Sequence, residues 1–289
     1  MKRQLILLFL TIMVPVYSLH MYNSRKAEDI LTGTVTEAYM ELNKQNDSLI
    51  HRDIDMIHKI TRTILQNPVM QRIGNPGAYT EYERIKNFEA LDDLLASYST
   101  AESGSGAVNY SFYAHDPEGY YSFAPRAQLT SRGVYFFGDG EMPDWYREAL
   151  ERKGSGYLKI FDRYGPAAKQ PTLAYVRAVN SIERANRPIG VLIATDVQHI
   201  VRESLNTVSL PDGEIYFTNW EGQVLASSDG QIGQVVNIPG QEKMDGYQGV
   251  YSVIDQDYVY IVHYNAYLQH KLLYKIPVEA MLARQSDLK

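Results

Sequence analysis

The chain has 289 residues, 45% hydrophobic and 21% charged, so it is long enough for about two domains with real cores and is not a disordered tail. Its formal net charge of -6 argues against a nucleic-acid partner, because phosphate binding needs clustered Lys and Arg. The chain has no cysteine, which excludes disulfide scaffolds, Cys-ligated zinc, iron–sulfur clusters and thiol catalysis.

The N-terminal segment has the pattern of an export signal. Lys2 and Arg3 precede an almost entirely apolar run from Leu5 to Tyr22, which as a helix is about 27 Å long, just short of a membrane core of about 30 Å. Two interpretations compete: an uncleaved anchor over residues 1–23, which we favour, and a signal peptide cleaved near residues 16–18. In both, the chain from about residue 24 onward lies outside the cell membrane.

A long helix is expected next, over residues 24–66. Apolar residues recur at steps of three and four from Leu31 to Ile64, and Asn67-Pro68 ends the pattern because the residue before a proline resists helical dihedrals. Such a helix is about 65 Å long, and we interpret residues 24–73 as a stalk. Its apolar stripe predicts a homodimer paired through the stalk; the alternative is that the stripe packs on the chain's own modules.

The pattern predicts a membrane-distal module over residues 74–207. A second helix is expected from Thr80 to Tyr98, and after a Gly/Ser loop the period changes to two, which is typical of strands. A short helix begins at Pro143, and another follows the last strand at Asp196. The expected strands are 109–114, 120–124 (returning after a turn at 115–119), 156–161, 173–179 and 190–195.

A membrane-proximal module is expected over residues 208–276. It repeats the order of strand, turn, strand, excursion and further strands, which indicates a weak internal repeat. Residues 277–289 are expected to form an exit helix toward a second membrane segment. The expected strands are 214–219, 223–227, 246–254, 257–265 and 270–275.

Four stretches together resemble the extracellular double Cache input region of bacterial receptors, and most closely that of YesM-like sensor histidine kinases. They are the basic anchor running into the long helix, Asp144-Trp145-Tyr146, the strand 187–196 with its Gly-x-Leu-x-x-x-Asp ending, and the Ile-Pro close of 272–277. The resemblance implies an α+β fold: a long N-terminal helix carrying two PAS-like (Cache) antiparallel-sheet modules. It also implies a histidine-kinase core beyond Lys289; a chemoreceptor input region is the alternative.

The resemblance further implies a ligand pocket in the distal module. The residues expected to face the ligand are Tyr121, Arg126, Trp145, Tyr146, Tyr175 and Asp196. Two structural alternatives stay open. Trp145 and Tyr146 could simply seal the module's core, and Asp196 could cap the following helix through the backbone N–H groups of residues 197–199.

The expected ligand class depends on one position at which this chain differs from amino-acid receptors of this kind. Amino-acid receptors of this kind carry an Arg two residues before the Trp, which clamps the ligand carboxylate, whereas this chain has Pro143 there. Arg126 and Arg132 lie upstream as candidate substitutes. The resemblance together with 23 tyrosines favours a small, polar, sugar-like ligand over a plain α-amino acid.

Neither a metal, a cofactor nor a catalytic centre is expected. His51, Asp55 and His58 share one face of the long helix and could hold a metal between two helices, but a solvated helix face is the favoured interpretation. The sequence has no nucleophile elbow, zinc-protease motif, P-loop or dinucleotide fingerprint. A secreted or tethered enzyme and a structural adaptor are the alternatives to a sensor.

Overall fold

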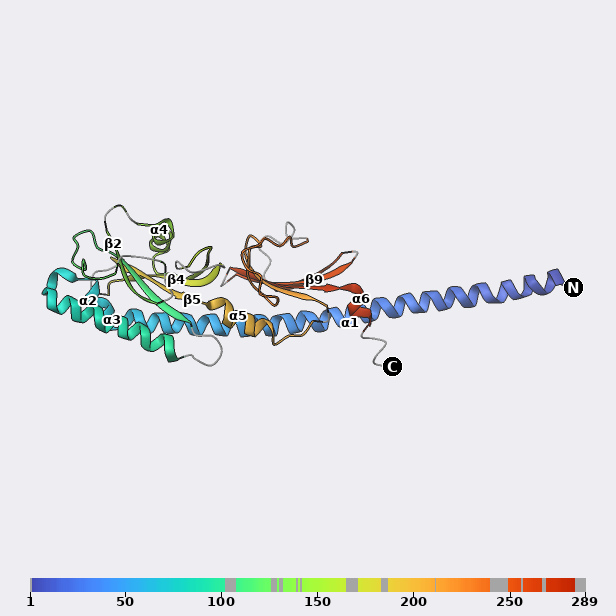
Figure 1. Ribbon diagram of the computed structural model, residues 1–289. Coiled ribbons are helices and arrows are strands. Elements are labelled where there is room, and N and C mark those ends of the chain that lie inside the picture. Colours follow the sequence, from blue (N-terminus) through green and yellow to red (C-terminus); the bar gives the residue numbers. More distant parts are fainter. Residues whose placement is uncertain are drawn as a thin grey trace.

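The computed structural model describes residues 2–283 apart from 102–107, 126–128, 130–131, 139, 141, 165–170, 183–186, 211, 240–248, 256 and 267–268. Figure 1 shows one long helix, α1 (Lys2–Gln66), with two sheets side by side along the same side of it. The predicted α+β class, with a long N-terminal helix carrying two sheet modules, is confirmed.

Helix α1 runs unbroken through the predicted anchor and stalk, and it includes Pro15. It ends at the predicted position, where the side chain of Asn67 accepts a hydrogen bond from the Val69 N–H at 2.9 Å and starts α2 (Pro68–Ile73). Within the part of the chain that the structure describes, no helix combines the length and apolar composition needed to cross a membrane.

The chain then turns back at the far end of α1. The short 3-10 helix η1 (Pro76–Ala78) leads into α3 (Glu81–Ala101), which lies alongside α1 (Figure 1). A capping box starts α3: the Glu83 carboxylate accepts from the Thr80 N–H at 2.8 Å, and the Thr80 hydroxyl accepts from the Glu83 N–H at 3.4 Å.

The N-terminal sheet has five strands in the order β2-β1-β5-β4-β3. Helices α1 and α3 pack on one face of it, and α4 (Asp144–Glu151) packs on the other. Helix α5 (Val197–Leu205) follows the last strand and leads into the second sheet. The strands are β1 (Asn109–His115), β2 (Gly133–Phe137), β3 (Tyr157–Phe161), β4 (Thr172–Asn180) and β5 (Pro188–Thr195).

The C-terminal sheet repeats this arrangement, in the order β7-β6-β10-β9-β8. Counted from its own first strand, each sheet has the order 2-1-5-4-3, so the two modules repeat one strand order, although β1 and β2 pair in parallel and β6 and β7 pair antiparallel. Helix α6 (Val278–Ala283) follows the last strand and lies against α1 (Figure 1). The strands are β6 (Glu214–Asn219), β7 (Val224–Ser227), β8 (Gly249–Ile254), β9 (Tyr258–Asn265) and β10 (His270–Pro277).

The predicted returning strand over 120–124 is wrong. The Asp116 carboxylate accepts hydrogen bonds from the N–H groups of Tyr120 at 3.0 Å and Tyr121 at 2.7 Å, and this holds the segment in turns. The neighbour of β1 is instead β2, which runs parallel to it with Ser111 opposite Gly133.

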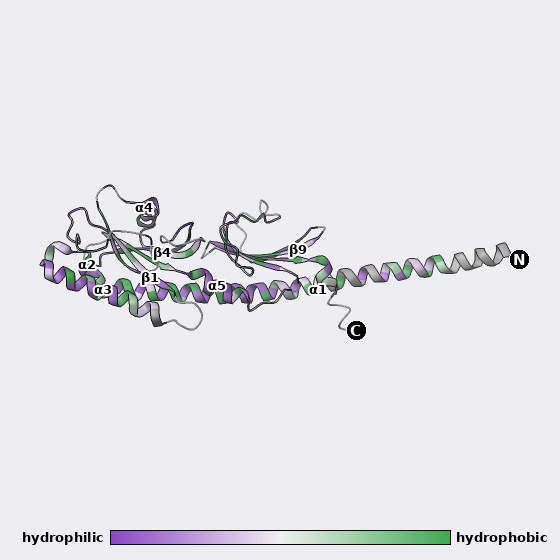
Figure 2. Cartoon of the chain, in the orientation of Figure 1, coloured by the Kyte–Doolittle hydropathy of each residue, from purple (hydrophilic) through white to green (hydrophobic). Residues whose placement is uncertain are grey.

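The apolar stripe of α1 packs on the chain's own sheets. Ile50, Ile54, Ile57 and Ile64 are at most 2% exposed and share one core with residues of both sheets. Figure 2 shows hydrophobic and hydrophilic positions alternating along α1 beneath the sheets. The part of the stripe from Ile50 to Ile64 is thus covered within one chain and offers no apolar surface to a second copy.

Candidate ligand-binding site

An aromatic cluster lies between the N-terminal sheet and α4. Tyr113 of β1 is its centre: its ring stacks on Tyr135 with centroids 5.3 Å apart and meets the edge of Trp145 at 5.2 Å. Strand alternation places Tyr113 on this face, because successive side chains of a strand point to opposite faces. The aromatic cluster consists of Tyr113, Tyr135, Phe137, Trp145, Tyr146, Phe161 and Tyr164.

Trp145 and Tyr146 both point into this cluster from the first turn of α4. Their ring centroids are 5.7 Å apart, Trp145 also contacts Phe161, and Tyr146 contacts Phe137 at 5.3 Å. Tyr146 is 2% exposed, and burial raises the pKa of its hydroxyl, whereas Trp145 is only half-buried. Both residues therefore lie in the aromatic cluster, an arrangement common to the predicted ligand-facing role and to the alternative that they seal the core.

The floor of the aromatic cluster is polar. The hydroxyls of Tyr113 and Tyr164 are 3.3 Å apart, and Ser111 also lies within hydrogen-bonding reach of Tyr164. Burial is the main reason that the pKa of Tyr164 lies well above its usual value, so this hydroxyl stays protonated. Sequence reasoning missed Tyr113 and Tyr164; strand alternation from Ser111 to Tyr113 was the available signal for the first.

Tyr121 and Tyr175 lie on the opposite face of the sheet. The Tyr121 hydroxyl donates to the Ile73 carbonyl at 3.2 Å, and the Tyr175 hydroxyl pairs with His58 Nδ1 of α1 at 2.7 Å. Tyr121 also lines a cavity of about 270 Å³ at the far end of α1. The structure therefore does not bring these two residues together with Trp145.

Asp196 follows β5 with left-handed backbone dihedrals, φ 65° and ψ 20°. Its carboxylate accepts a hydrogen bond from the Asn109 side chain at 3.1 Å. The alternative of a side-chain helix cap is wrong, since this side chain makes no capping hydrogen bond and α5 begins with the backbone contact from His199 N–H to the Asp196 carbonyl. Arg126, the sixth predicted residue, lies outside the described residues.

The candidate metal face of α1 is occupied by other contacts. Asp55 pairs with Lys59 at 2.7 Å, and His58 turns to Tyr175. Among the residues that the structure describes, no group of three or more His, Asp or Glu is arranged to hold a metal ion.

At the start of α4, Pro143 is the N-cap residue, and Arg147 one turn later pairs with Asp144. Pro143 stands where an Arg would clamp a ligand carboxylate, so this position carries no charge. Arg147 of α4 is exposed and already paired with Asp144.

No model of a known protein family matches the chain, and no curated protein matches it. Solved structures do match, and they define a class of fold: sensory domains of bacterial receptors. The periplasmic sensory domain of the Campylobacter jejuni chemoreceptor Tlp1 superposes with a TM-score of 0.59 at 13% identity, covering 87% of this chain and 98% of that domain.

Two further structures show the same fold. The sensory domain of the Campylobacter jejuni chemoreceptor Tlp3 (CcmL) with isoleucine bound has a TM-score of 0.53 at 13% identity, over 88% of this chain and 97% of that one. The extracellular domain of rpHK1S-Z16, named as a histidine kinase, has a TM-score of 0.53 at 15% identity, over 86% and 98%. At such identities the shared property is the fold, which agrees with the predicted double Cache architecture.

Proposed function

We propose that this chain is the ligand-sensing input region of a bacterial membrane receptor, positioned outside the cell membrane, and that it has no catalytic activity of its own. The observation that carries the proposal is the aromatic cluster under α4, set in a fold shared with sensory domains along nearly the whole chain. An aromatic surface with a few buried hydroxyls is the usual composition of a small-molecule site.

The ligand, in this proposal, is small, polar and uncharged, and sugar-like. The Tyr113 and Tyr164 hydroxyls supply donors and acceptors, and Trp145 supplies an apolar ring face, while Pro143 stands where an Arg would clamp a carboxylate. The isoleucine in the Tlp3 domain makes an amino acid the competing ligand class.

Signalling would run along α1. This helix is continuous from Lys2 to Gln66 and packs on both sheets, so a shift between the sheets and the helix reaches its N-terminal half as a rigid-body displacement. In our proposal the predicted anchor at residues 1–23 holds this end in the membrane, and the effector is a histidine kinase, with a chemoreceptor as the alternative.

A thermal-shift screen of the purified chain against neutral sugars, amino acids and organic acids tests the proposal. A ligand at 100 times its Kd stabilises the folded state by about 2.7 kcal/mol. We expect a neutral sugar to raise the melting temperature, and Trp145→Ala to abolish that rise while Tyr82→Ala, which truncates a 69% exposed ring, preserves it.

Two results would count against the proposal. If only amino acids raise the melting temperature, the ligand is an amino acid and not a sugar-like molecule. A rise that survives both Trp145→Ala and Asp196→Ala would remove the ligand from the α4 face.

A further inference from the structure

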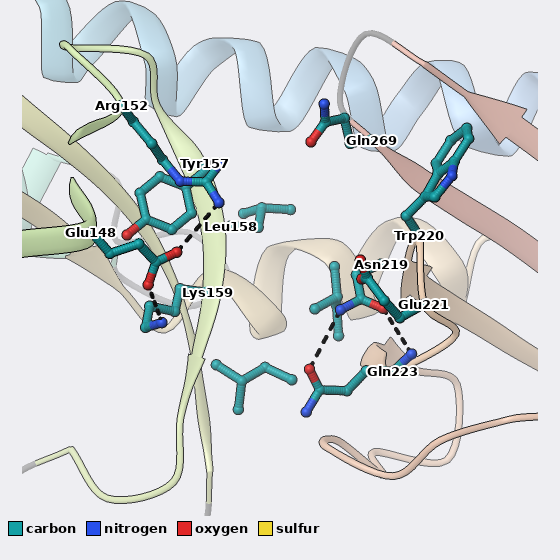
Figure 3. Close-up of a pocket in the computed structure, with 12 residues that line it drawn as sticks. Glu148, Arg152, Tyr157, Leu158, Lys159, Asn219, Trp220, Glu221, Gln223 and Gln269 are labelled. Carbon is teal, nitrogen blue, oxygen red and sulfur yellow. Dashed lines mark hydrogen bonds and ion pairs between the residues drawn. The ribbon is translucent and has the colours of Figure 1, made fainter. Parts of the chain in front are cut away.

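A cavity of about 280 Å³ lies between the two sheets, at the C-terminal end of α4, and none of the seven residues of the aromatic cluster lines it. Figure 3 shows that its two walls come from different modules: α4 and β3 on one side, and the β6–β7 turn on the other. Its size is slightly below the range of about 300–1000 Å³ that is typical of sites for drug-sized ligands, which suits a molecule as large as a mono- or disaccharide.

The wall from the N-terminal module is a network of paired charges. The Glu148 carboxylate contacts Lys159 Nζ at 2.6 Å and Arg152 at 3.3 Å, and the Arg152 guanidinium lies 3.9 Å from the centroid of the Tyr157 ring. Both cations on this wall are therefore engaged by Glu148, and an anionic ligand would have to displace that carboxylate.

The wall from the C-terminal module presents amides and an indole. Asn219 Oδ1 accepts from the Gln223 N–H at 2.8 Å, and the two side-chain amides meet at 3.5 Å, so the turn is held in one shape. The indole of Trp220 is half-buried and is held edge-on to Tyr264, with ring centroids 5.1 Å apart. Gln269 adds a third amide to the lining.

We propose that this cavity is a binding site for a neutral, polyhydroxylated molecule of mono- to disaccharide size. Two acidic and two basic side chains line it, so the wall has no net charge: Glu148, Glu221, Arg152 and Lys159. Amides and a carboxylate–guanidinium pair offer adjacent donors and acceptors to neighbouring hydroxyls, and the Trp220 ring can cover the C–H face of a sugar. Leu158, Ile160 and Leu225 form an apolar floor.

Because the two walls belong to different modules, such a ligand would bridge them. Its binding would favour the spacing of the sheets at which both walls contact it, and would therefore bias how the sheets sit on α1. The cavity lies beside α4 but shares no lining residue with the aromatic cluster, so a different tryptophan reports each site.

The two tryptophans of the chain allow a direct test, because Trp145 lies in the aromatic cluster and Trp220 lines the cavity. In Trp145→Phe the fluorescence of Trp220 alone reports the cavity, and in Trp220→Phe that of Trp145 alone reports the α4 face. Glucose, galactose, xylose, maltose, cellobiose and sucrose are titrated into both variants.

We expect at least one of these sugars to change the Trp220 emission with a saturable dependence. Added to the Trp145→Phe background, Gln223→Ala and Arg152→Ala, which lie on opposite walls, should each weaken this response at least tenfold. Gln231→Ala is the matched control, because Gln231 is exposed and does not line the cavity. Melting curves verify that each variant folds.

If Trp220 responds to none of the six sugars, the proposal is overturned, whatever Trp145 does. A saturable Trp145 response with a silent Trp220 would leave the α4-face ligand standing and remove only the cavity. A Trp220 response that is unchanged in both wall variants would also overturn the proposal, since the emission would then report a change elsewhere.

Discussion

His270 Nε2 of β10 lies 2.6 Å from Asp47 Oδ1 of α1, and both residues are buried. His263 Nδ1 and the Asn265 amide of β9 lie 3.2 and 3.0 Å from the other carboxylate oxygen. This Asp47 cluster (Asp47, His263, Asn265 and His270) ties the long helix to the C-terminal sheet by hydrogen bonds from two strands to one carboxylate.

The Asp47 cluster has a defined charge state. Burial works to raise the pKa of the Asp47 carboxyl, but the hydrogen bonds with His263, His270 and Asn265 outweigh it and hold the pKa well below its ordinary value. Burial lowers the pKa of His270, and the Asp47 carboxylate only partly offsets this. At neutral pH the pair is thus an ionised Asp47 and a neutral His270 that donates from Nε2.

Asp47→Ala should destabilise the chain by about 3 kcal/mol or more, because it leaves buried donors unpaired at about 1–3 kcal/mol each. The free energy of unfolding in urea measures this. Glu41→Ala, which removes an exposed carboxylate paired with Lys44 on the same helix, should change it by only about 0.5 kcal/mol. Similar effects of the two variants would contradict the role of the Asp47 cluster.

The lowered pKa of His270 predicts a dependence of stability on pH. Below about 6.5 the unfolded chain binds a proton that the folded chain resists, so the free energy of unfolding falls as the pH drops below that value. The depressed pKa of Asp47 acts in a different window: its contribution is present above about pH 3.9 and is lost only in stronger acid.

His270→Gln, which keeps a side-chain N–H donor, should flatten the decline of stability between pH 6.5 and about 5. The pKa of His58 is also lowered mainly by burial, so His58 likewise makes stability fall as the pH drops. The readout is therefore the difference in the slope of the free energy of unfolding against pH between His270→Gln and the unaltered chain. Gln45→Ala, on an exposed residue of α1 that does not titrate and lies outside the Asp47 cluster, is the control and should leave the slope unchanged. An unchanged slope in His270→Gln would refute the prediction.

Neighbouring residues of α1 test which face of the helix the sheets cover. Ile57 is completely buried, so Ile57→Ala should reduce the free energy of unfolding by about 2–5 kcal/mol. Met56 is 42% exposed, and Met56→Ala should change it by only about 0.5 kcal/mol. Equal losses in denaturant titrations would mean that the apolar stripe does not pack as described.

A homodimer through α1 remains a prediction, and the structure changes how it must be tested. Gln45 and Arg52 are exposed, whereas Ile50 is completely buried against the chain's own sheets. In membranes that contain the receptor, single cysteines at Gln45 or Arg52 should cross-link between chains, and a cysteine at Ile50 should not. If no position on the exposed face cross-links, the dimer has no support.

Local signals predicted most elements well. Asn67-Pro68 ends α1 and Pro143 precedes α4, because proline restricts the backbone wherever it stands. Strand β6 was predicted with the observed bounds. Strand β2 was missed because it runs parallel to β1: a long connection joins the two strands, whereas the turn at 115–119 predicted an antiparallel partner directly after it.

Within the candidate site, the sequence placed Trp145 and Tyr146 together because they are adjacent on one helix. The sequence could not predict on which face of the N-terminal sheet each tyrosine lies, because both faces are buried and their residues have similar hydropathy. Gly190 is a similar case: a Cβ there would lie 2.3 Å from the Tyr113 carbonyl oxygen, a close approach that only the packed strands reveal.

By itself the sequence determined the class of the fold, the long helix, the repeat of two sheet modules and the absence of cysteine chemistry, because periodicity and composition are properties of neighbouring residues. Only the tertiary structure decided that Tyr121 contacts α2 and Tyr175 contacts α1, on the face of the sheet opposite α4, and that the walls of one cavity come from two modules. It also brought Asp47 to His270 across 223 positions of chain. Contacts between residues so far apart in the sequence depend on the register in which the helix and the sheets pack, and no local sequence pattern encodes that register.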